Sequence, residues 1–204
     1  MGDCCQGENT TIEKLARDHR VVLWTVLVIN LVMFGAEAIA GWLASSSALI
    51  GDSLDMLGDA VTYGSSIAVV GRAGDKKASV ARLKAWIMLI FGLVISARCL
   101  YRAAFPVMPD FGVMLLVGGA ALVANLICLG LLTRHRNDDI NMKSVWICSR
   151  NDIIANTAVL AAAGLVFGLA SPLPDLFVGI GLAFLFTRSA LMIFREAGPA
   201  AHPA

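Results

Sequence analysis

The sequence predicts an all-α, polytopic membrane protein with six transmembrane helices and with both termini on the cytoplasmic side. Three observations predict this fold class. The 204 residues are 58% hydrophobic and only 15% charged, whereas a typical soluble domain has about 25% charged residues. The mean hydropathy is +0.76. Six apolar runs also reach the length of roughly 17–25 residues that a membrane-spanning helix needs.

Short polar breaks separate the six apolar runs. The first two runs are separated by the three serines at 45–47, and the third and fourth by Pro106 and Pro109, which interrupt helices. Residues 171–175, which include two further prolines, separate the fifth run from the sixth. We place the six helices at about 21–43, 48–71, 82–104, 111–133, 144–169 and 174–194.

The distribution of lysine and arginine predicts the orientation. The connection at 71–84 carries five basic residues, and further basic residues lie in the stretch 1–20 and after the fourth helix. The connections on the opposite side are short, and only Arg98 and Arg102 lie near them. Since basic connections stay in the cytoplasm, we expect both chain ends on the cytoplasmic side.

The whole chain is expected to form one transmembrane unit. No signal peptide is expected, because the first twenty residues are polar. The net charge of +1 argues against a nucleic-acid partner, so membrane lipid is the expected surrounding. We expect an integral protein of a bacterial inner (plasma) membrane, with a cytoplasmic tail at 1–20, a six-helix domain at 21–196 and a short cytoplasmic tail at 197–204.

Three carboxylates lie inside the second apolar run. At about 100° per residue, Asp52, Asp55 and Asp59 fall within an arc of roughly 60° on one helix face. Like charges this close repel one another unless a cation lies between them. A charge near the bilayer centre costs at least a few kcal/mol, and such groups are usually functional. The three acids therefore predict a cation site.

A second polar cluster interrupts the fifth apolar run, where Cys148, Asp152 and Asn156 are spaced four residues apart. The second and fifth helices run antiparallel, and both clusters lie about 12–18 Å from the cytoplasmic ends of their helices. We therefore expect the clusters to meet. Asp55 and Asp59 would then provide oxygen ligands together with Asp152.

Cys148 has two open interpretations, as a sulfur ligand or as a small apolar filler. Four ligands that include a thiolate suit Zn²⁺ or Cd²⁺ in tetrahedral geometry. A site made of carboxylates alone suits Mn²⁺ or another harder ion.

Three polar residues around this cluster have supporting roles. Asp52 is expected nearest the outer mouth, where it attracts cations, and Asn156 lies one helical turn past Asp152, where it can support the metal ligands. Glu37 in the first run either relays protons or accepts a hydrogen bond from a neighbouring helix. The alternative for all these acids is ion pairing with Arg98, Arg102 or Arg150, but the acids on one face outnumber the nearby bases.

Two groups of residues outside the apolar runs have side chains of the kinds that bind metals. The vicinal pair Cys4 and Cys5 either captures soft metal ions on the cytoplasmic side or is simply exposed in the tail. His135, Asp138 and Asp139 follow the fourth run and either bind metal weakly at the entrance or are solvated loop residues.

Several stretches carry a family resemblance. They comprise Asn30, Phe34, Glu37, Gly41, Ser47, Ala48, Leu49, Asp52, Ser53, Asp55 and Asp59 in the first two helices, Asp152, Asn156, Val159 and Leu160 in the fifth, and Pro174, Asp175, Gly179, Arg188, Ser189, Ala190, Leu191 and Glu196 in the sixth. In these stretches the chain resembles the cation diffusion facilitators, over nearly all of residues 21–196.

The resemblance implies a homodimeric, six-helix transporter that exports zinc or related divalent ions in exchange for protons by alternating access. In this family the transport site takes two residues four apart on helix 2 and two on helix 5. Here these residues are Asp55, Asp59, Cys148 and Asp152. No fixed cofactor and no enzymatic activity are implied.

The chain departs from the family pattern in two respects. Zinc transporters of the family usually have histidine at the position of Asp55 or of Cys148, and neither is histidine here. Neither substitution excludes Zn²⁺, so Zn²⁺ transport and possible Cd²⁺ transport both remain expected. Most members carry a cytoplasmic metal-binding domain after the sixth helix, and we expect a short member that lacks it.

Two rival functions remain. The spacing of Asp52, Asp55 and Asp59 is similar to the aspartate-rich site of metal-dependent membrane phosphatidyltransferases, but Met56 stands where those enzymes have glycine and no Ala-Arg pair follows. A passive divalent-cation channel is the second rival. Its metal flux would be indifferent to an imposed pH gradient.

Overall fold

The computed structural model describes residues 3–69, 75–138 and 140–196, in which all regular secondary structure is helical. Side chains are described from Asp18 onward, apart from those of residues 66, 68–69, 75–81, 84, 140–141, 144 and 196. The six helices are α1 (Asp3–Leu43), α2 (Ser47–Val69), α3 (Asp75–Ala104), α4 (Phe111–Thr133), α5 (Ile140–Leu169) and α6 (Leu173–Glu196). The prediction of an all-α protein with six long helices is therefore confirmed.

Two helices begin earlier than the hydropathy predicts. α1 begins at Asp3, so most of the stretch 1–20 is helical, and α3 begins at Asp75, inside the stretch 71–84 that was expected to be a connection. Hydropathy measures the length of chain that lipid can surround. A helix nucleated inside the membrane adds one backbone hydrogen bond for each further residue, so it can continue past the apolar run.

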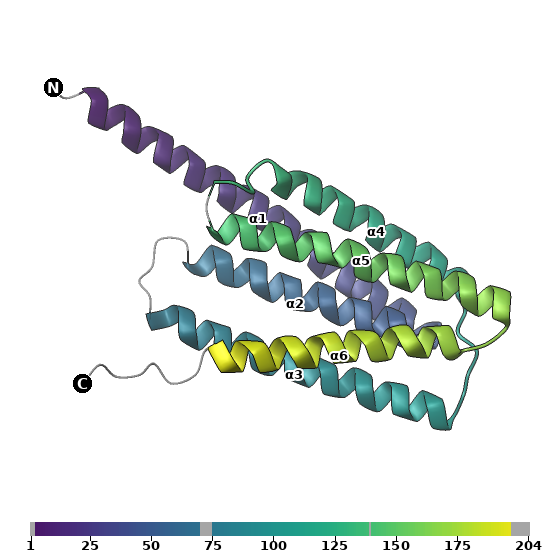
Figure 1. Cartoon of the computed structure of the whole chain (residues 1–204). Helices are drawn as coiled ribbons and strands as arrows, with labels where there is room; N and C mark the ends of the chain where they lie inside the picture. The colour runs from purple at the N-terminus through teal and green to yellow at the C-terminus, as the bar shows by residue number, and fades with distance from the viewer. Residues whose placement is uncertain (1–2, 70–74, 139, 197–204) are drawn as a thin grey trace, which may run out of the picture.

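Five of the helices contain segments long and apolar enough to cross a membrane, namely Asp18–Leu43, Ala85–Ala104, Phe111–Thr133, Val145–Leu169 and Leu173–Arg195. The acid-bearing helix α2 is not among them. It packs against α1, α3, α5 and α6, which makes it the central helix of the bundle (Figure 1). A central position keeps the carboxylates of α2 away from lipid, where they would be most costly.

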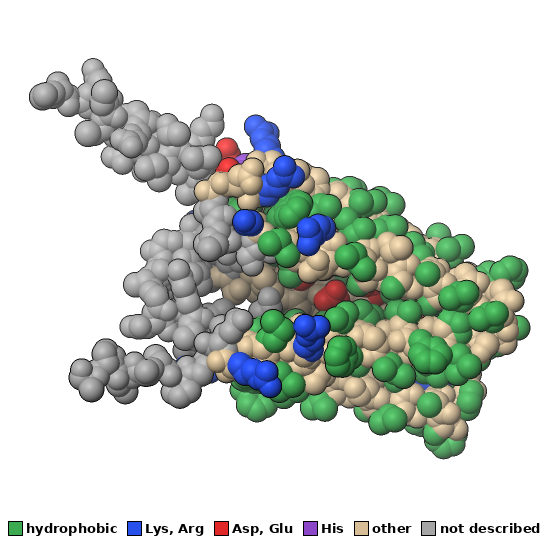
Figure 2. All heavy atoms as spheres, in the orientation of Figure 1, with side chains coloured by type: hydrophobic (Ala, Val, Ile, Leu, Met, Phe, Trp, Pro, Cys, Tyr) green, Lys and Arg blue, Asp and Glu red, His purple; other side chains and the backbone are tan. Residues whose placement is uncertain are grey.

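The outer surface of the bundle is apolar. Large side chains such as Trp42, Leu100, Leu116 and Phe177 are between 71% and 75% exposed. Apolar side chains cover most of the face seen in Figure 2, and basic side chains gather toward one end of it. An apolar surface of this extent would be unfavourable in water, whereas lipid solvates it. The protein is therefore an integral membrane protein.

One end of the bundle holds both ends of the described chain. α1, α3 and α5 begin there, and α2, α4 and α6 end there (Figure 1). The α2–α3 and α4–α5 connections therefore lie at this same end, which we call the terminal end. The basic side chains visible in Figure 2 gather at the terminal end.

Glycines allow α6 to approach α3 and α2 closely. A Cβ atom added to Gly92 of α3 would lie 2.5 Å from Oγ1 of Thr187 and 3.2 Å from the carbonyl oxygen of Ala183, both on α6. A Cβ atom on Gly179 of α6 would lie 3.1 Å from Cβ of Ser47. Small residues have this role in membrane bundles because association there depends on close packing.

A carboxylate of α6 fixes the start of α2. Oδ1 of Asp175 accepts hydrogen bonds from Oγ of Ser46 (2.5 Å) and the amide of Ala48 (3.1 Å), and Oδ2 accepts one from the amide of Ser47 (2.7 Å). The preceding Ser45 has φ 58°, which turns the chain between α1 and α2. The N-terminal amides of α2 are thus capped by a residue distant in sequence.

Candidate metal centre

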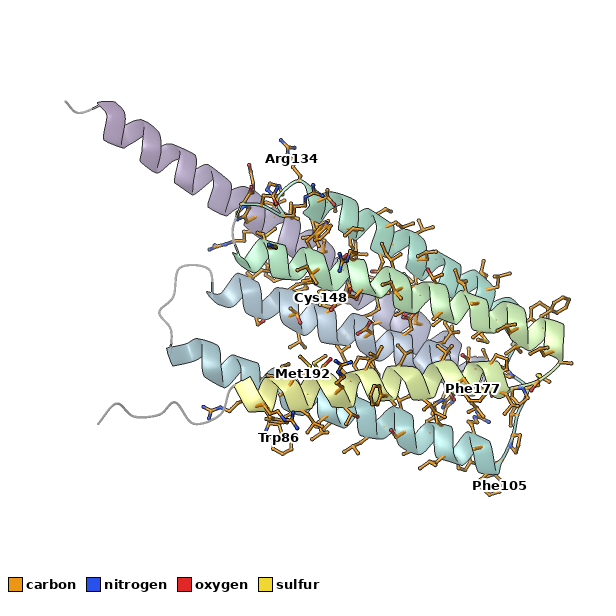
Figure 3. All side chains as sticks on the ribbon, viewed as in Figure 1. Trp86, Phe105, Arg134, Cys148, Phe177 and Met192 are labelled. Atoms are coloured by element: carbon orange, nitrogen blue, oxygen red, sulfur yellow. The ribbon has the colours of Figure 1, made fainter. Side chains whose placement is uncertain are left out.

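The two predicted ligand pairs lie on neighbouring antiparallel helices. Asp55 and Asp59 are on α2, and Cys148 and Asp152 are on α5, which packs against α2. Asp59 and Asp152 are buried, with 4% and 7% exposure, and the other two are partly exposed. Figure 3 shows Cys148 on α5 in the half of the bundle nearer the terminal end. The cluster therefore lies at the α2–α5 interface, with two of its four members buried and two partly exposed.

Asp59 connects the two helices. Sγ of Cys148 donates a hydrogen bond to Oδ1 of Asp59 at 3.1 Å, across the α2–α5 interface. The hydroxyl of Tyr63 donates to Oδ2 of the same carboxylate at 2.6 Å. Both carboxylate oxygens therefore accept hydrogen bonds, which offsets the cost of burying the group.

Asp152 is less well satisfied. Its Oδ2 atom is buried and has no hydrogen-bond partner among the described residues. The carboxyl groups of Asp59 and Asp55 lie near enough to interact electrostatically with that of Asp152. A buried carboxylate oxygen without a donor, next to other carboxylates, is unfavourable by itself. A divalent cation between these groups would give the unpartnered oxygen a ligand bond and would offset the repulsion between the carboxylates.

The four predicted ligands do not form a closed cage in this structure. They are not among the compact groups of three or more ligand atoms that the described residues form. A tetrahedral zinc site separates its sulfur and oxygen ligands by about 3.5 Å, so the 3.1 Å pair of Cys148 and Asp59 needs to open only slightly. Asp55 and Asp152 would complete the ligand set by turning toward that pair.

A second polar layer lies beside the first. Nδ2 of Asn156 donates to both carboxylate oxygens of Asp52 at 2.8 Å, and its Oδ1 accepts from Nδ2 of Asn125 on α4 at 3.0 Å. These bonds join α2, α5 and α4. Asp52 is only 1% exposed, and its expected role in attracting cations near the outer mouth stays a prediction. The helices around central α2 enclose it.

Glu37 brings a further carboxyl group from α1 to this layer. Its side chain is fully buried beside Asp52. Neither of its oxygens has a hydrogen-bond partner among the described residues. The carboxyl group of Glu37 interacts with that of Asp52 on α2, so proton relay and hydrogen bonding to a neighbouring helix both stay predictions for Glu37.

Comparison with known protein families assigns the chain. A family model described as the cation efflux transmembrane domain matches residues 23–200. The chain belongs to the cation efflux family. The match includes all of α2 to α6 and most of the apolar part of α1, and it confirms the resemblance to cation diffusion facilitators. The protein is thus a divalent metal cation efflux transporter, in a family of transporters rather than enzymes. No curated protein matches the sequence significantly.

Arg98 and Arg150 of this cation efflux transporter make contacts other than ion pairs with Asp59 or Asp152. Arg98 donates to two backbone carbonyls near the α1–α2 turn, at 3.3 and 3.4 Å. Arg150 lies over the ring of Trp146, 5.5 Å from its centroid. The ion pairs between described side chains join two histidines to Asp138 and do not include Asp59 or Asp152.

Sequence reasoning missed Tyr63, which is fully buried and bonded to Asp59. Its position offered a signal, because it follows Asp59 by four residues and so lies on the same helix face. A tyrosine in an apolar run was easily taken as packing alone. Its hydroxyl instead orients the carboxylate toward α5.

A separate group of polar side chains lies at the terminal end. Nε2 of His19 and Nδ1 of His135 each lie 2.8 Å from Oδ2 of Asp138. The hydrogen bonds from His19 and from His135 hold the pKa of Asp138 below its usual value. The sequence analysis named His135 and Asp138 but not His19, because 119 residues separate His19 from Asp138 and no spacing links them. Outside the described residues lie Asp139 and the side chains of Cys4 and Cys5.

Proposed function

We propose that the protein exports Zn²⁺, with Cd²⁺ as a second substrate, in exchange for protons, through a site formed by Asp55, Asp59, Cys148 and Asp152. The observation that carries this proposal is the 3.1 Å contact between Sγ of Cys148 and Oδ1 of Asp59. It brings together, from α2 and α5, a thiol and a carboxylate inside a bundle whose outer surface is apolar. A thiolate with carboxylates suits Zn²⁺ and softer divalent ions.

The same contact suggests how metal and protons exchange. The thiol of Cys148 donates a hydrogen bond to Asp59 and so keeps its proton, whereas a metal ligand must be a thiolate. Metal binding would therefore expel this proton, together with any proton shared by Asp152 and its neighbouring acids. On the other side of the membrane, protons would return to the same groups and release the metal. Metal and protons thus compete for one negative cluster.

Glu37 and Asp52 are suited to carry protons next to this cluster. Both carboxyl groups are buried, they lie beside each other on α1 and α2, and Asn156 holds Asp52 in place. Asn156 also lies one turn from Asp152 on α5. We propose that these groups form a proton path rather than additional metal ligands.

We propose the same orientation and assembly that the sequence predicts. The terminal end, where basic side chains gather in Figure 2, would face the cytoplasm, as basic connections do. Metal would then enter the bundle from that end and leave at the other by alternating access. A homodimer in a bacterial inner membrane is the expected working form.

Proton exchange is tested with the purified full-length protein in liposomes that contain a zinc indicator and a pH indicator. An acidic lumen should accelerate Zn²⁺ uptake several-fold, and uptake should raise the pH of the lumen. Collapsing the pH gradient with a potassium–proton exchanger, at clamped membrane potential, is the control. Zn²⁺ flux that ignores the pH gradient would identify a passive channel and contradict antiport.

Cys148 is tested separately by its effect on metal preference. Replacing Cys148 by serine exchanges a soft sulfur ligand for a harder oxygen ligand. We expect the ratio of apparent affinities for Cd²⁺ and Mn²⁺ to fall by about tenfold or more in competition uptake. Cys99→Ser is the matched control, because Cys99 is buried on α3 away from the site. An unchanged ratio in Cys148→Ser would remove Cys148 from the ligand set.

A further inference from the structure

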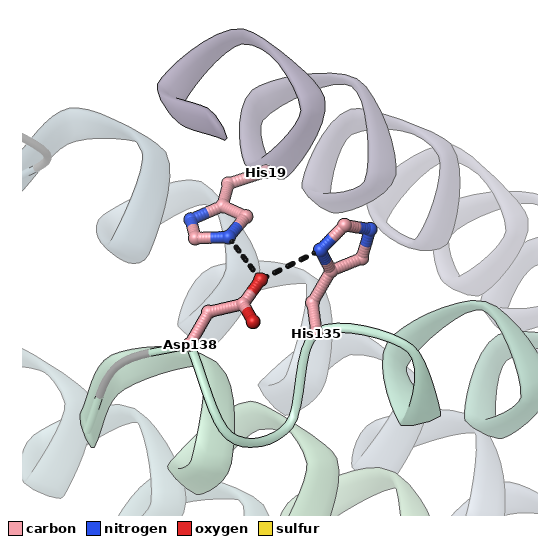
Figure 4. A group of neighbouring side chains, drawn as sticks. All are labelled: His19, His135 and Asp138. Atoms are coloured by element: carbon pink, nitrogen blue, oxygen red, sulfur yellow. Dashed lines mark hydrogen bonds and ion pairs between the residues drawn. The ribbon is translucent and has the colours of Figure 1, made fainter. Parts of the chain in front are cut away.

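Three side chains with metal-binding chemistry converge at the terminal end, away from the transport site. His19 comes from α1, and His135 and Asp138 come from the connection between α4 and α5 (Figure 4). Each histidine places one ring nitrogen 2.8 Å from Oδ2 of Asp138. The two rings meet edge to face with their centroids 5.2 Å apart. Both rings therefore point at one carboxylate oxygen.

The arrangement is more ordered than a solvated loop requires. The side chains of His19 and His135 are only 13% and 12% exposed, and that of Asp138 is 30% exposed. The amide of His135 donates to the carbonyl of Leu132, and the amide of Asp138 donates to the carbonyl of His135. These bonds form consecutive turns that hold His135 and Asp138 on the same side of the connection. The cluster remains accessible to an ion through Asp138.

The donor set fits a divalent transition-metal ion. One ligand atom from each residue can be chosen so that all three lie within 4.8 Å of one another. Tetrahedral zinc with nitrogen and oxygen ligands at about 2.0 Å separates those atoms by roughly 3.3 Å. The observed nitrogen–oxygen distances of 2.8 Å need to lengthen by only about half an ångström. Neutral imidazole and carboxylate ligands suit Zn²⁺ and Co²⁺ better than Ca²⁺ or Mg²⁺.

The neighbouring basic residues do not prevent a divalent ion from binding to this cluster. Arg136 belongs to the same connection, but its guanidinium lies over the ring of Trp146, 5.6 Å from the centroid. Imidazole ligands bind through lone pairs and need no net negative charge. A site with one carboxylate and two imidazoles can therefore hold a dication beside a basic connection.

We propose that His19, His135 and Asp138 form a second divalent-metal site of this transporter, which binds Zn²⁺-class ions at the terminal end of the bundle. Three protein ligands leave a fourth position open for water, which is typical of exchangeable metal sites rather than closed structural ones. An ion bound there would join α1 to the α4–α5 connection. The proposal does not require Asp59 or Cys148 to be ligands.

The test uses the full-length protein in detergent with Asp59→Asn and Asp152→Asn as the background, so that the proposed transport site is disabled. Co²⁺ binding is followed by visible absorption, and Zn²⁺ affinity is obtained by competition. We expect the background protein to retain one Co²⁺ with a nitrogen–oxygen spectrum. His135→Gln, His19→Gln or Asp138→Asn should each weaken this binding by at least about tenfold.

His202→Gln is the matched control, because it removes the remaining histidine of the chain and should leave the binding unchanged. If a histidine variant fails to fold, Asp138→Asn decides the question, since Asp138 is an exposed residue of a connection. Binding that is unchanged in Asp138→Asn would mean that the three residues form only a hydrogen-bonded contact between α1 and the connection. A thiolate-to-cobalt absorption band as the only Co²⁺ signal, unchanged in Asp138→Asn, would assign the ion to cysteine and would also overturn the proposal. If the proposed transport site were wrong, the background would bind an extra ion, but the effect of Asp138→Asn would remain.

Discussion

Replacing Asp59 by asparagine is expected to reduce Zn²⁺ transport in proteoliposomes by at least about a hundredfold, while the protein remains folded. Asparagine keeps the size of the side chain and an oxygen that accepts the hydrogen bond from Tyr63. It removes the negative charge and is a poor metal ligand. A loss of about 3 kcal/mol of metal binding corresponds to a factor of about one hundred. Asp152→Asn should have a similar effect from the α5 side.

Asp110→Asn is the matched control for this prediction. Asp110 is an exposed aspartate that caps α4, with Oδ1 accepting a hydrogen bond from the amide of Val113 at 3.1 Å. Asparagine caps helices about as well as aspartate, so transport and stability should stay near wild type. The proposed site would be ruled out if Asp59→Asn and Asp152→Asn both transported Zn²⁺ at the rate of Asp110→Asn.

Replacing Asp175 by alanine should produce the largest loss of stability. The carboxylate is 2% exposed and accepts three hydrogen bonds at the start of α2. Alanine would leave the hydroxyl of Ser46 and the amides of Ser47 and Ala48 without this acceptor in a buried position. Hydrogen bonds to charged groups contribute about 1.5–3 kcal/mol each, so we expect a loss of at least about 3 kcal/mol. The start of α2 would then no longer be held against α6.

Replacing Asp175 by asparagine distinguishes the contribution of the hydrogen bonds in this cap from the contribution of side-chain packing. Its single carbonyl oxygen can accept the bonds from Ser46 and Ala48, but its amide group would face the donor of Ser47. Asp175→Asn should therefore be intermediate between wild type and Asp175→Ala. Thermal unfolding in detergent, followed through the fluorescence of the four tryptophans, measures this series.

Asp110→Ala provides the comparison for an exposed helix cap, where the expected loss is only about 1 kcal/mol. A melting temperature of Asp175→Ala equal to that of Asp110→Ala would mean that the buried cap adds nothing beyond an ordinary one. In that case another contact must hold α2 against α6.

The sequence predicted the parts of this protein that depend on local pattern. The apolar runs and the polar breaks between them identified six helices, five of which contain segments long and apolar enough to cross a membrane. The four-residue spacing on α2 and α5 identified Asp59 and Cys148, and these two residues are in contact at 3.1 Å. Such spacing is informative because side chains four apart share one helix face. The family match covers both helices that carry these residues.

The early starts of α1 and α3 illustrate a limit of local pattern. A helix that continues past the apolar run is no longer constrained by lipid, so hydropathy carries little information about where it begins. The burial of Asp52 could not be predicted for a related reason. Its depth along the helix was clear, but its burial depends on Asn156 and Glu37 from two other helices.

The sequence by itself determined that this chain is a six-helix membrane protein with acids inside its second and fifth apolar runs, because lipid imposes length and polarity on each segment separately. Tertiary structure alone decided that α2 is central, that Asp175 caps it from α6 and that Tyr63 orients Asp59. It also brought His19 to Asp138, across 119 residues. These features depend on which helices are neighbours, and neighbours are chosen by packing among all six helices rather than by any one segment.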